Sequence, residues 1–162
     1  MNIVLRRLLA FAIDCGLLAV YAGILFAVSP FLRPLFTGSP YTAELTGFLL
    51  LTLPFGLYFA ICEASLWSAS IGKRAMKLRV VDFSTNKRLR FSKSLLRSAA
   101  KFLPWELAHF AIWHAFVFAS NLQYIAMGAL TISYILMIAY IVGLVRTPHR
   151  TLYDRTAHTK VV

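Results

Sequence analysis

Residues 103–145 read LPWELAHFAIWHAFVFASNLQYIAMGALTISYILMIAYIVGLV, and no Lys or Arg occurs among these 43 residues. As one straight α-helix the stretch would be about 65 Å long, roughly twice the hydrocarbon thickness of a bilayer. It therefore has to fold back on itself, and Ser120-Asn121 is the predicted point of reversal. This predicts two membrane spans, near residues 104–119 and 122–145.

Two further apolar stretches precede this one. The first runs from about residue 8 to residue 28, and the second from about residue 45 to residue 62. Each is long enough to cross the hydrocarbon core of a bilayer. Of the 162 residues, 59% are hydrophobic and the mean hydropathy is +0.70, which excludes a freely soluble monomer. We expect a single all-α integral membrane domain over residues 1–162, built as a four-helix transmembrane bundle.

The distribution of basic residues predicts the orientation of the bundle. Lys and Arg number 17 against 6 Asp and Glu, which gives a net charge of +11. Ten of the basic residues lie in the loop at 63–103, four lie in the tail at 146–162, and Arg6 and Arg7 precede the first span. Positive residues favour the cytoplasmic side, so four spans place both termini in the cytoplasm at the cell (inner) membrane. In the three-span alternative, residues 104–119 lie in the interface and the tail is outside.

The long basic loop is predicted to contain two amphipathic helices and a small β-hairpin. Residues 70–79 place apolar side chains on one side of a helical wheel and basic ones on the other, which is typical of a segment lying on anionic lipid headgroups. A second helix is predicted to begin at its N-cap, Ser92, and to end at Pro104. Between the helices, residues 78–82 and 87–91 are β-prone runs on either side of a turn.

Asp14 is the first candidate for a functional residue. A carboxylate two turns into a span costs on the order of 2.5 to 3.5 kcal/mol unless it is paired or faces water. Arg7 shares its helix face but lies about 10 Å away along the axis, too far for direct pairing. Two interpretations stay open. Either Asp14 pairs with a loop base such as Arg74 or Arg97 and pins the loop to the bundle, or it is a cation or proton site.

Glu106 and His109 are the second candidates. They stand at i, i+3 on one helix face, a spacing that contributes to metal sites in four-helix bundles. A complete site needs a second such motif, which the sequence lacks, so no metal is predicted. Glu106 also falls in the first turn after Pro104, where a carboxylate favours the helix dipole and can meet Lys101 or Arg97. We expect a structural or interfacial role, with a proton relay as the alternative.

The sequence lacks the motifs of the common enzyme classes. It contains no G-x-S-x-G, no P-loop and no H-E-x-x-H. Cys15 and Cys62 lie in apolar runs without a CxxC spacing, which argues against a zinc site or a disulfide framework. Only 14% of the residues are charged, and the apolar stretches are too long for a nucleic-acid-binding domain. We expect no enzyme activity, no cofactor and no nucleic-acid partner.

Three stretches are characteristic when taken together: RLLAFAID at 7–14, SIGKRAMKLRVV at 70–81 and TLYDRTAHTKVV at 151–162. In order and spacing they resemble the RDD family of small multi-pass membrane proteins, named for an Arg and two Asp. The signature residues that this resemblance implies are Arg7, Asp14 and Asp154. Further family-like positions are Gly72, Lys73 and Arg97. One departure is Tyr153, because the family commonly has His just before the second signature Asp.

The resemblance implies a function related to transport, with cation/proton exchange for some members and a role as membrane partner of proteases for others. Four spans are few to enclose an alternating-access pathway, so transport would need a homo-oligomer. We therefore expect transport of cations, protons or a small solute. The alternative is a non-catalytic scaffold or regulatory partner, in which Asp14 and Asp154 hold the basic loop and tail against the bundle. That surface would bind lipid headgroups or another membrane protein, and Asp154 would pair with Lys73 or Arg74.

Overall fold

The computed structural model describes residues 2–162, and nearly all of its regular structure is helical. The elements in chain order are α1 (Ile3–Ala27), α2 (Ser29–Leu32), η1 (Arg33–Phe36), α3 (Pro40–Gly47), η2 (Phe48–Thr52), α4 (Leu53–Ala64), α5 (Ile71–Ala75), β1 (Val80–Asp82), α6 (Phe91–Ala111), η3 (Ile112–Val117), α7 (Gln123–Arg146), α8 (Leu152–Thr156) and β2 (Thr159–Val161). The turns η2 and η3 are π-helical, so α3 runs on into α4 and α6 runs on into η3.

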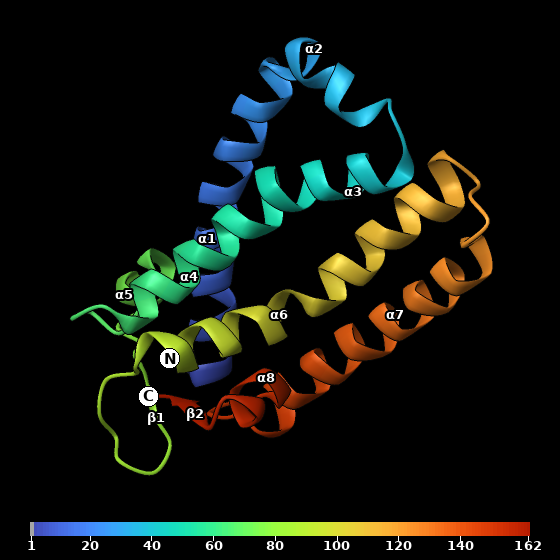
Figure 1. The fold of residues 1–162 in the computed structure, drawn as a ribbon. Helices are drawn as coiled ribbons and strands as arrows, with labels where there is room; N and C mark the ends of the chain where they lie inside the picture. The colour runs from blue at the N-terminus through green and yellow to red at the C-terminus, as the bar shows by residue number, and fades with distance from the viewer. Residues whose placement is uncertain (1) are drawn as a thin grey trace.

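Four long helical segments follow one another in alternating directions, and both termini lie at the same end of the molecule (Figure 1). Within the described residues, three of these segments are long and apolar enough to cross a membrane: Ile3–Ala27, Pro40–Ala64 and Gln123–Arg146. The fourth, α6 with η3, packs between α4 and α7. The first half of α6 carries cations, and its second half is apolar. The prediction of an all-α integral membrane protein is therefore confirmed.

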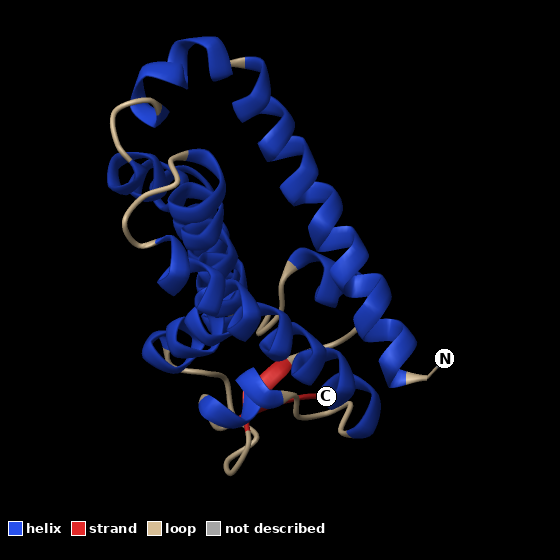
Figure 2. Ribbon diagram, turned by 90° about the vertical axis from the view of Figure 1, so that its right-hand side faces the viewer, coloured by secondary structure: helices blue, strands red, loops and turns tan. Residues whose placement is uncertain are grey.

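The first helix leans away from the layer formed by α4, α6 and α7 (Figure 2). Its buried residues are Arg7, Ala10 and Asp14, all in its N-terminal half, where α5 packs against it. A Cβ added at Gly16 or Gly23 would meet no other atom within 4 Å. The outer part of α1 therefore makes few contacts within the chain, and its firm attachment is at the polar end of the bundle.

The predicted partner of the first β-strand is wrong. Instead of forming a hairpin with residues 87–91, β1 pairs antiparallel with β2 at the C-terminus, with Val80 opposite Val161. The downstream run contributes one isolated bridge, between Val81 and Arg88. Pairing of β1 with β2 is favoured over pairing with residues 87–91 because Val161 is completely buried in a small core with Val80 and neighbouring apolar side chains. The two-stranded sheet thereby joins the C-terminal tail to the basic loop.

The first predicted amphipathic helix is α5, and its packing partner within the chain is α1. It is five residues long and packs against α1, with Gly72 and Lys73 buried and Ile71 about half exposed. A Cβ on Gly72 would collide with the backbone carbonyl oxygen of Ala10, so the two backbones approach as closely as glycine allows. The helical wheel placed Lys73 on the face turned to lipid headgroups, whereas the structure buries it against Glu63.

The second predicted amphipathic helix is α6, and both of its predicted ends are wrong. It begins one residue after Arg90, which occupies the N-cap in place of Ser92, and it continues through Pro104. Proline has no N–H, so the carbonyl of Ala100 loses its helical donor. The hydroxyl of Tyr140 on α7 donates to this carbonyl at 2.5 Å, and Ser133 Oγ donates to the carbonyl of Pro104 at 2.6 Å. Helix α7 thus satisfies the backbone where the proline would otherwise break α6.

Candidate functional site

A chain of alternating buried charges joins five elements at the polar end of the bundle. Lys73 Nζ lies 2.7 Å from Glu63 Oε1, and Glu63 Oε2 lies 2.6 Å from Arg97 Nη1. Arg97 Nε lies 2.8 Å from Asp154 Oδ1, whose other oxygen lies 3.2 Å from Arg7 Nη2. All five side chains are buried. This charge chain, Lys73–Glu63–Arg97–Asp154–Arg7, fixes the loop and the tail on the helices.

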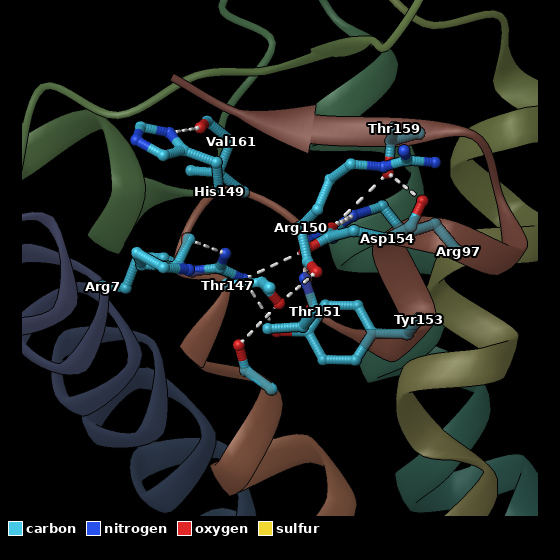
Figure 3. A network of polar contacts seen from close by, with 12 residues as sticks. Arg7, Arg97, Thr147, His149, Arg150, Thr151, Tyr153, Asp154, Thr159 and Val161 are labelled. Carbon is cyan, nitrogen blue, oxygen red and sulfur yellow. Dashed lines mark hydrogen bonds and ion pairs between the residues drawn. The ribbon is translucent and has the colours of Figure 1, made fainter. Parts of the chain in front are cut away.

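A capping motif at the start of α8 orients the carboxylate of Asp154 toward the charge chain. Thr151 and Asp154 form a capping box at the start of α8, in which the backbone N–H and the hydroxyl of Thr151 donate to Asp154 Oδ2 at 3.0 and 2.6 Å. Arg7 approaches the same oxygen and also donates to the carbonyl of Pro148 at 2.5 Å. Figure 3 shows these groups converging on one carboxylate. The capped turn therefore holds Asp154 ready for two guanidinium groups.

The electrostatics of Asp154 and Arg97 keep both groups charged. Burial alone raises the pKa of the Asp154 carboxyl, but the guanidinium groups of Arg97 and Arg7 outweigh burial and hold that pKa below its ordinary value. Arg97 is also charged, because a guanidinium group stays protonated in proteins. The pairing is therefore an ion pair throughout the physiological pH range.

Asp14 lies in a second cluster, made of neutral donors. Its Oδ2 accepts from Ser70 Oγ at 2.6 Å, and its Oδ1 accepts from the Gly72 N–H at 2.9 Å and from the Tyr58 hydroxyl at 3.0 Å. Within residues 2–162, it is the buried carboxylate without an ion pair, since the other two, Glu63 and Asp154, both belong to the charge chain. Asp14 thus pins α5 to α1 while remaining free of a counter-cation.

A cleft between α1 and α4 leads to this cluster. It has a volume of about 220 Å³ and is lined by Leu17, Leu18, Tyr21, Pro54, Phe55 and Tyr58. Tyr58 belongs to both features, because its side chain lines the cleft and its hydroxyl donates to Asp14. The Asp14 carboxylate is itself only 2% exposed. The Tyr58 side chain therefore separates the carboxylate from the cleft.

A comparison with protein-family models identifies the family. The model of the RDD family matches residues 3–158, nearly the whole chain. The chain belongs to the RDD family. Neither a curated protein nor a solved structure matches it. In this RDD protein the signature residues divide between the two clusters, with Arg7 and Asp154 in the charge chain and Asp14 among neutral donors.

Several predicted partners of the signature residues in this RDD protein are wrong. Asp14 pairs with neither Arg74 nor Arg97, and Asp154 pairs with neither Lys73 nor Arg74. Lys73 instead binds Glu63, which directly follows the predicted second span. Arg74 makes no ion pair in the described chain, and its guanidinium lies over the ring of Trp67. These pairings join residues far apart in the sequence, so no local spacing could reveal them.

The departure at Tyr153 fits the charge chain. Its hydroxyl accepts a hydrogen bond from Arg7 Nη2 at 3.0 Å, and its ring lies 5.0 Å from the guanidinium carbon of Arg97. The ring also packs edge-on against Tyr140 of α7. A tyrosine at this position therefore takes part in holding both arginines.

Glu106 and His109 belong to neither cluster. Glu106 Oε1 accepts from the hydroxyl of Thr52 and lies 3.6 Å from His109 Nδ1, so the predicted meeting of Glu106 with Lys101 or Arg97 is wrong. The arginine is already engaged in the charge chain. Across residues 2–162 no three His, Cys, Asp or Glu side chains come together as a metal-binding group. The contact to Thr52 joins α6 to the helix Pro40–Ala64, which is an interfacial role.

Proposed function

We propose that this RDD protein exchanges cations for protons across the membrane and that Asp14 is the exchanging carboxylate. The observation that carries the proposal is the state of Asp14, which is buried, lacks a counter-cation and borders a cleft through Tyr58. A carboxylate whose negative charge is uncompensated inside a membrane protein is a functional candidate by default. A proton or a metal cation can neutralise it, and the two compete for the same oxygens.

The neighbouring hydroxyls suit both states of such an exchange. A hydroxyl is one donor and also an acceptor, so Ser70 and Tyr58 can accept from the protonated carboxyl or turn their lone pairs toward a bound cation. Hard cations prefer oxygen ligands, and the hydroxyls with the carboxylate supply three or four of them. The charge chain keeps α5 in place meanwhile, because Lys73 next to Gly72 stays bound to Glu63.

The proposed topology has four crossings, with α6 and η3 as the third. Support comes from the alternating helix directions and from the basic α5 and C-terminal tail, which lie at the end that holds both termini (Figure 1). By the positive-inside rule this end faces the cytoplasm at the cell (inner) membrane. We further propose a homo-oligomer, since four spans are few for a pathway and the outer part of α1 is little packed. No enzymatic step belongs to this proposal.

A second candidate function is a non-catalytic scaffold or regulatory partner of another membrane protein. The charge chain favours it, because loop and tail are held as one rigid surface on which basic side chains remain without carboxylate partners. A rigid basic surface attracts a partner with acidic side chains as the two proteins approach. It also fixes the orientation in which that partner binds. In this case Asp14 serves to pin α5 to α1 and exchanges nothing.

Proton flux in liposomes distinguishes the two functions. Purified protein is reconstituted, a gradient of Na⁺ or K⁺ is imposed, and the internal pH is followed with a fluorescent dye. Exchange by the wild type and its loss in Asp14→Asn supports transport. The control is Asp82→Asn, at a carboxylate of β1 that is ion-paired with Lys93 and lies outside the Asp14 cluster. The variants must elute as the wild type does in size exclusion. Absence of exchange by the wild type, or full exchange by Asp14→Asn, contradicts the proposal and leaves the scaffold.

A further inference from the structure

A recess of about 320 Å³ opens beside α5 at the polar end of the bundle. Two short segments at the start of the basic loop form most of the wall of the recess. The segment after α4 contributes Leu66, Trp67 and Ala69, and α5 with the turn after it contributes Arg74, Lys77 and Arg79. The recess therefore combines an apolar and aromatic side with a basic one.

The three cations of the recess are uncompensated. Within residues 2–162, no carboxylate forms an ion pair with Arg74, Lys77 or Arg79. The guanidinium of Arg74 lies 4.2 Å from the centre of the Trp67 ring. Stacking occupies the face of the guanidinium and leaves its N–H edge free to donate, which is the geometry that recognises phosphate oxygens. The ligand that this wall favours is anionic and rich in oxygen acceptors.

The backbone of the recess is held from outside the loop. Arg6 of α1 donates to the carbonyl of Met76 at 2.9 and 2.6 Å and to the carbonyl of Lys77 at 2.6 Å. Arg79 exchanges backbone hydrogen bonds of 2.8 and 2.9 Å with Val162 at the C-terminus. The backbone of the recess is thus fixed before a ligand binds, so binding does not have to order it.

The position of the recess along the bundle favours a membrane lipid as the source of the anion. Leu66 and Trp67 are 81% and 54% exposed, and they follow directly after Ala64, where the candidate span Pro40–Ala64 ends. Tryptophan is enriched at the boundary between hydrocarbon and water, which is the depth of phospholipid headgroups. An exposed Leu–Trp pair beside unpaired cations thus presents apolar surface to acyl chains and basic surface to phosphates at the same depth.

We propose that this recess binds the phosphate-bearing headgroup of an anionic phospholipid, with Leu66 and Trp67 against its acyl chains. The site differs from the lipid contact predicted from the sequence, in which Lys73 would have faced the headgroups, because Lys73 is buried against Glu63. The lipid lies outside the Asp14 cluster, so the proposal holds whether or not the protein transports cations.

Native mass spectrometry of the purified protein tests the proposal, with phosphatidylglycerol titrated into detergent micelles and phosphatidylcholine as the neutral comparison. Each basic residue near a lipid surface contributes about fivefold to affinity, so Arg74→Gln with Lys77→Gln is expected to weaken phosphatidylglycerol binding about 25-fold. The matched control is Lys87→Gln with Arg88→Gln, which removes the same charge from exposed positions of the same loop. Its binding is expected to stay at the wild-type level.

Two further arms complete the test. Trp67→Ala leaves the charge unchanged and is expected to weaken binding as well, because it removes the support of Arg74. Equal losses in the recess variant and the control variant would show a diffuse charge effect and overturn the proposal. Competition by inorganic phosphate as strong as that by phosphatidylglycerol would show a soluble ligand and overturn the lipid assignment. All variants are compared at matching size-exclusion profiles.

Discussion

The guanidinium of Arg7 binds the carboxylate of Asp154 at 3.2 Å, although 147 positions separate the two residues in the sequence. Arg97 holds the other oxygen of the same carboxylate at 2.8 Å. The first helix, α6 and the tail therefore meet at one buried anion. Removing one partner of a buried ion pair leaves the other charge buried and unpaired. Loss of the contact between Arg7 and Asp154 would therefore destabilise the folded state.

The first prediction concerns this contact. Arg7→Gln is expected to lower the free energy of unfolding by about 3–5 kcal/mol, because it leaves part of the charge on Asp154 uncompensated. Chemical denaturation in detergent measures the change. Lys93→Gln, at the more exposed pair with Asp82, is the control and is expected to change stability little. An effect of Arg7→Gln no larger than that of the control would contradict the assignment.

A second prediction follows from the pKa of Asp154, which its arginines hold below the ordinary value of 3.8. Above pH 3.8 the carboxyl is ionised in both the folded and the unfolded state, and its contribution to stability is complete. Below that pH the unfolded state takes up a proton first, so stability falls until the folded carboxyl is also protonated. Thermal unfolding across acidic pH is expected to show this loss for the wild type. In Asp154→Asn, which starts less stable, the acid-dependent loss should be smaller, and an unchanged slope would refute the linkage.

Much of the bundle, but little of its polar centre, could be predicted from the sequence. Hydropathy located α7 and the helix Pro40–Ala64 because a span needs only a sufficient length of apolar residues. The ion pairs could not be predicted, since Glu63 and Arg97 come together only when α4 packs on α6. A helical wheel likewise cannot show that a lysine side chain is buried by another element. Asp14 could be found as a charge inside an apolar span, whereas Asp154 was found through the family resemblance, and neither signal says which residues these carboxylates bind.

A third prediction tests the close approach of α5 and α1. Gly72→Ala is expected to displace α5, because the added methyl group collides with the carbonyl of Ala10 and with the carboxyl group of Asp14. Limited proteolysis of the basic loop should become faster, and the melting temperature should fall. Gly16→Ala is the matched control, since its methyl group meets nothing and alanine favours a helix. If the two variants behave alike, the packing of α5 on α1 is wrong.

A fourth prediction concerns the carbonyl of Ala100, which Pro104 deprives of its helical donor and Tyr140 supplies with another. Tyr140→Phe leaves this carbonyl unpaired, so a loss of about 1–3 kcal/mol in the free energy of unfolding is expected. In a Pro104→Ala background the backbone N–H of residue 104 returns to the carbonyl, and the same tyrosine substitution should then cost much less. Tyr134→Phe, at an exposed position of α7, controls for the loss of a phenol hydroxyl.

The double-mutant cycle over Tyr140 and Pro104 isolates this one hydrogen bond, because each single substitution changes a different donor to the same carbonyl. A coupling free energy near zero would mean that Tyr140→Phe costs the same with and without Pro104, so that the hydroxyl does not replace the missing donor. A coupling of the expected sign would mean that α7 makes α6 continuous. Since α6 carries Arg97 and the apolar half that lies beside α7, its continuity connects the buried charge chain to the bundle.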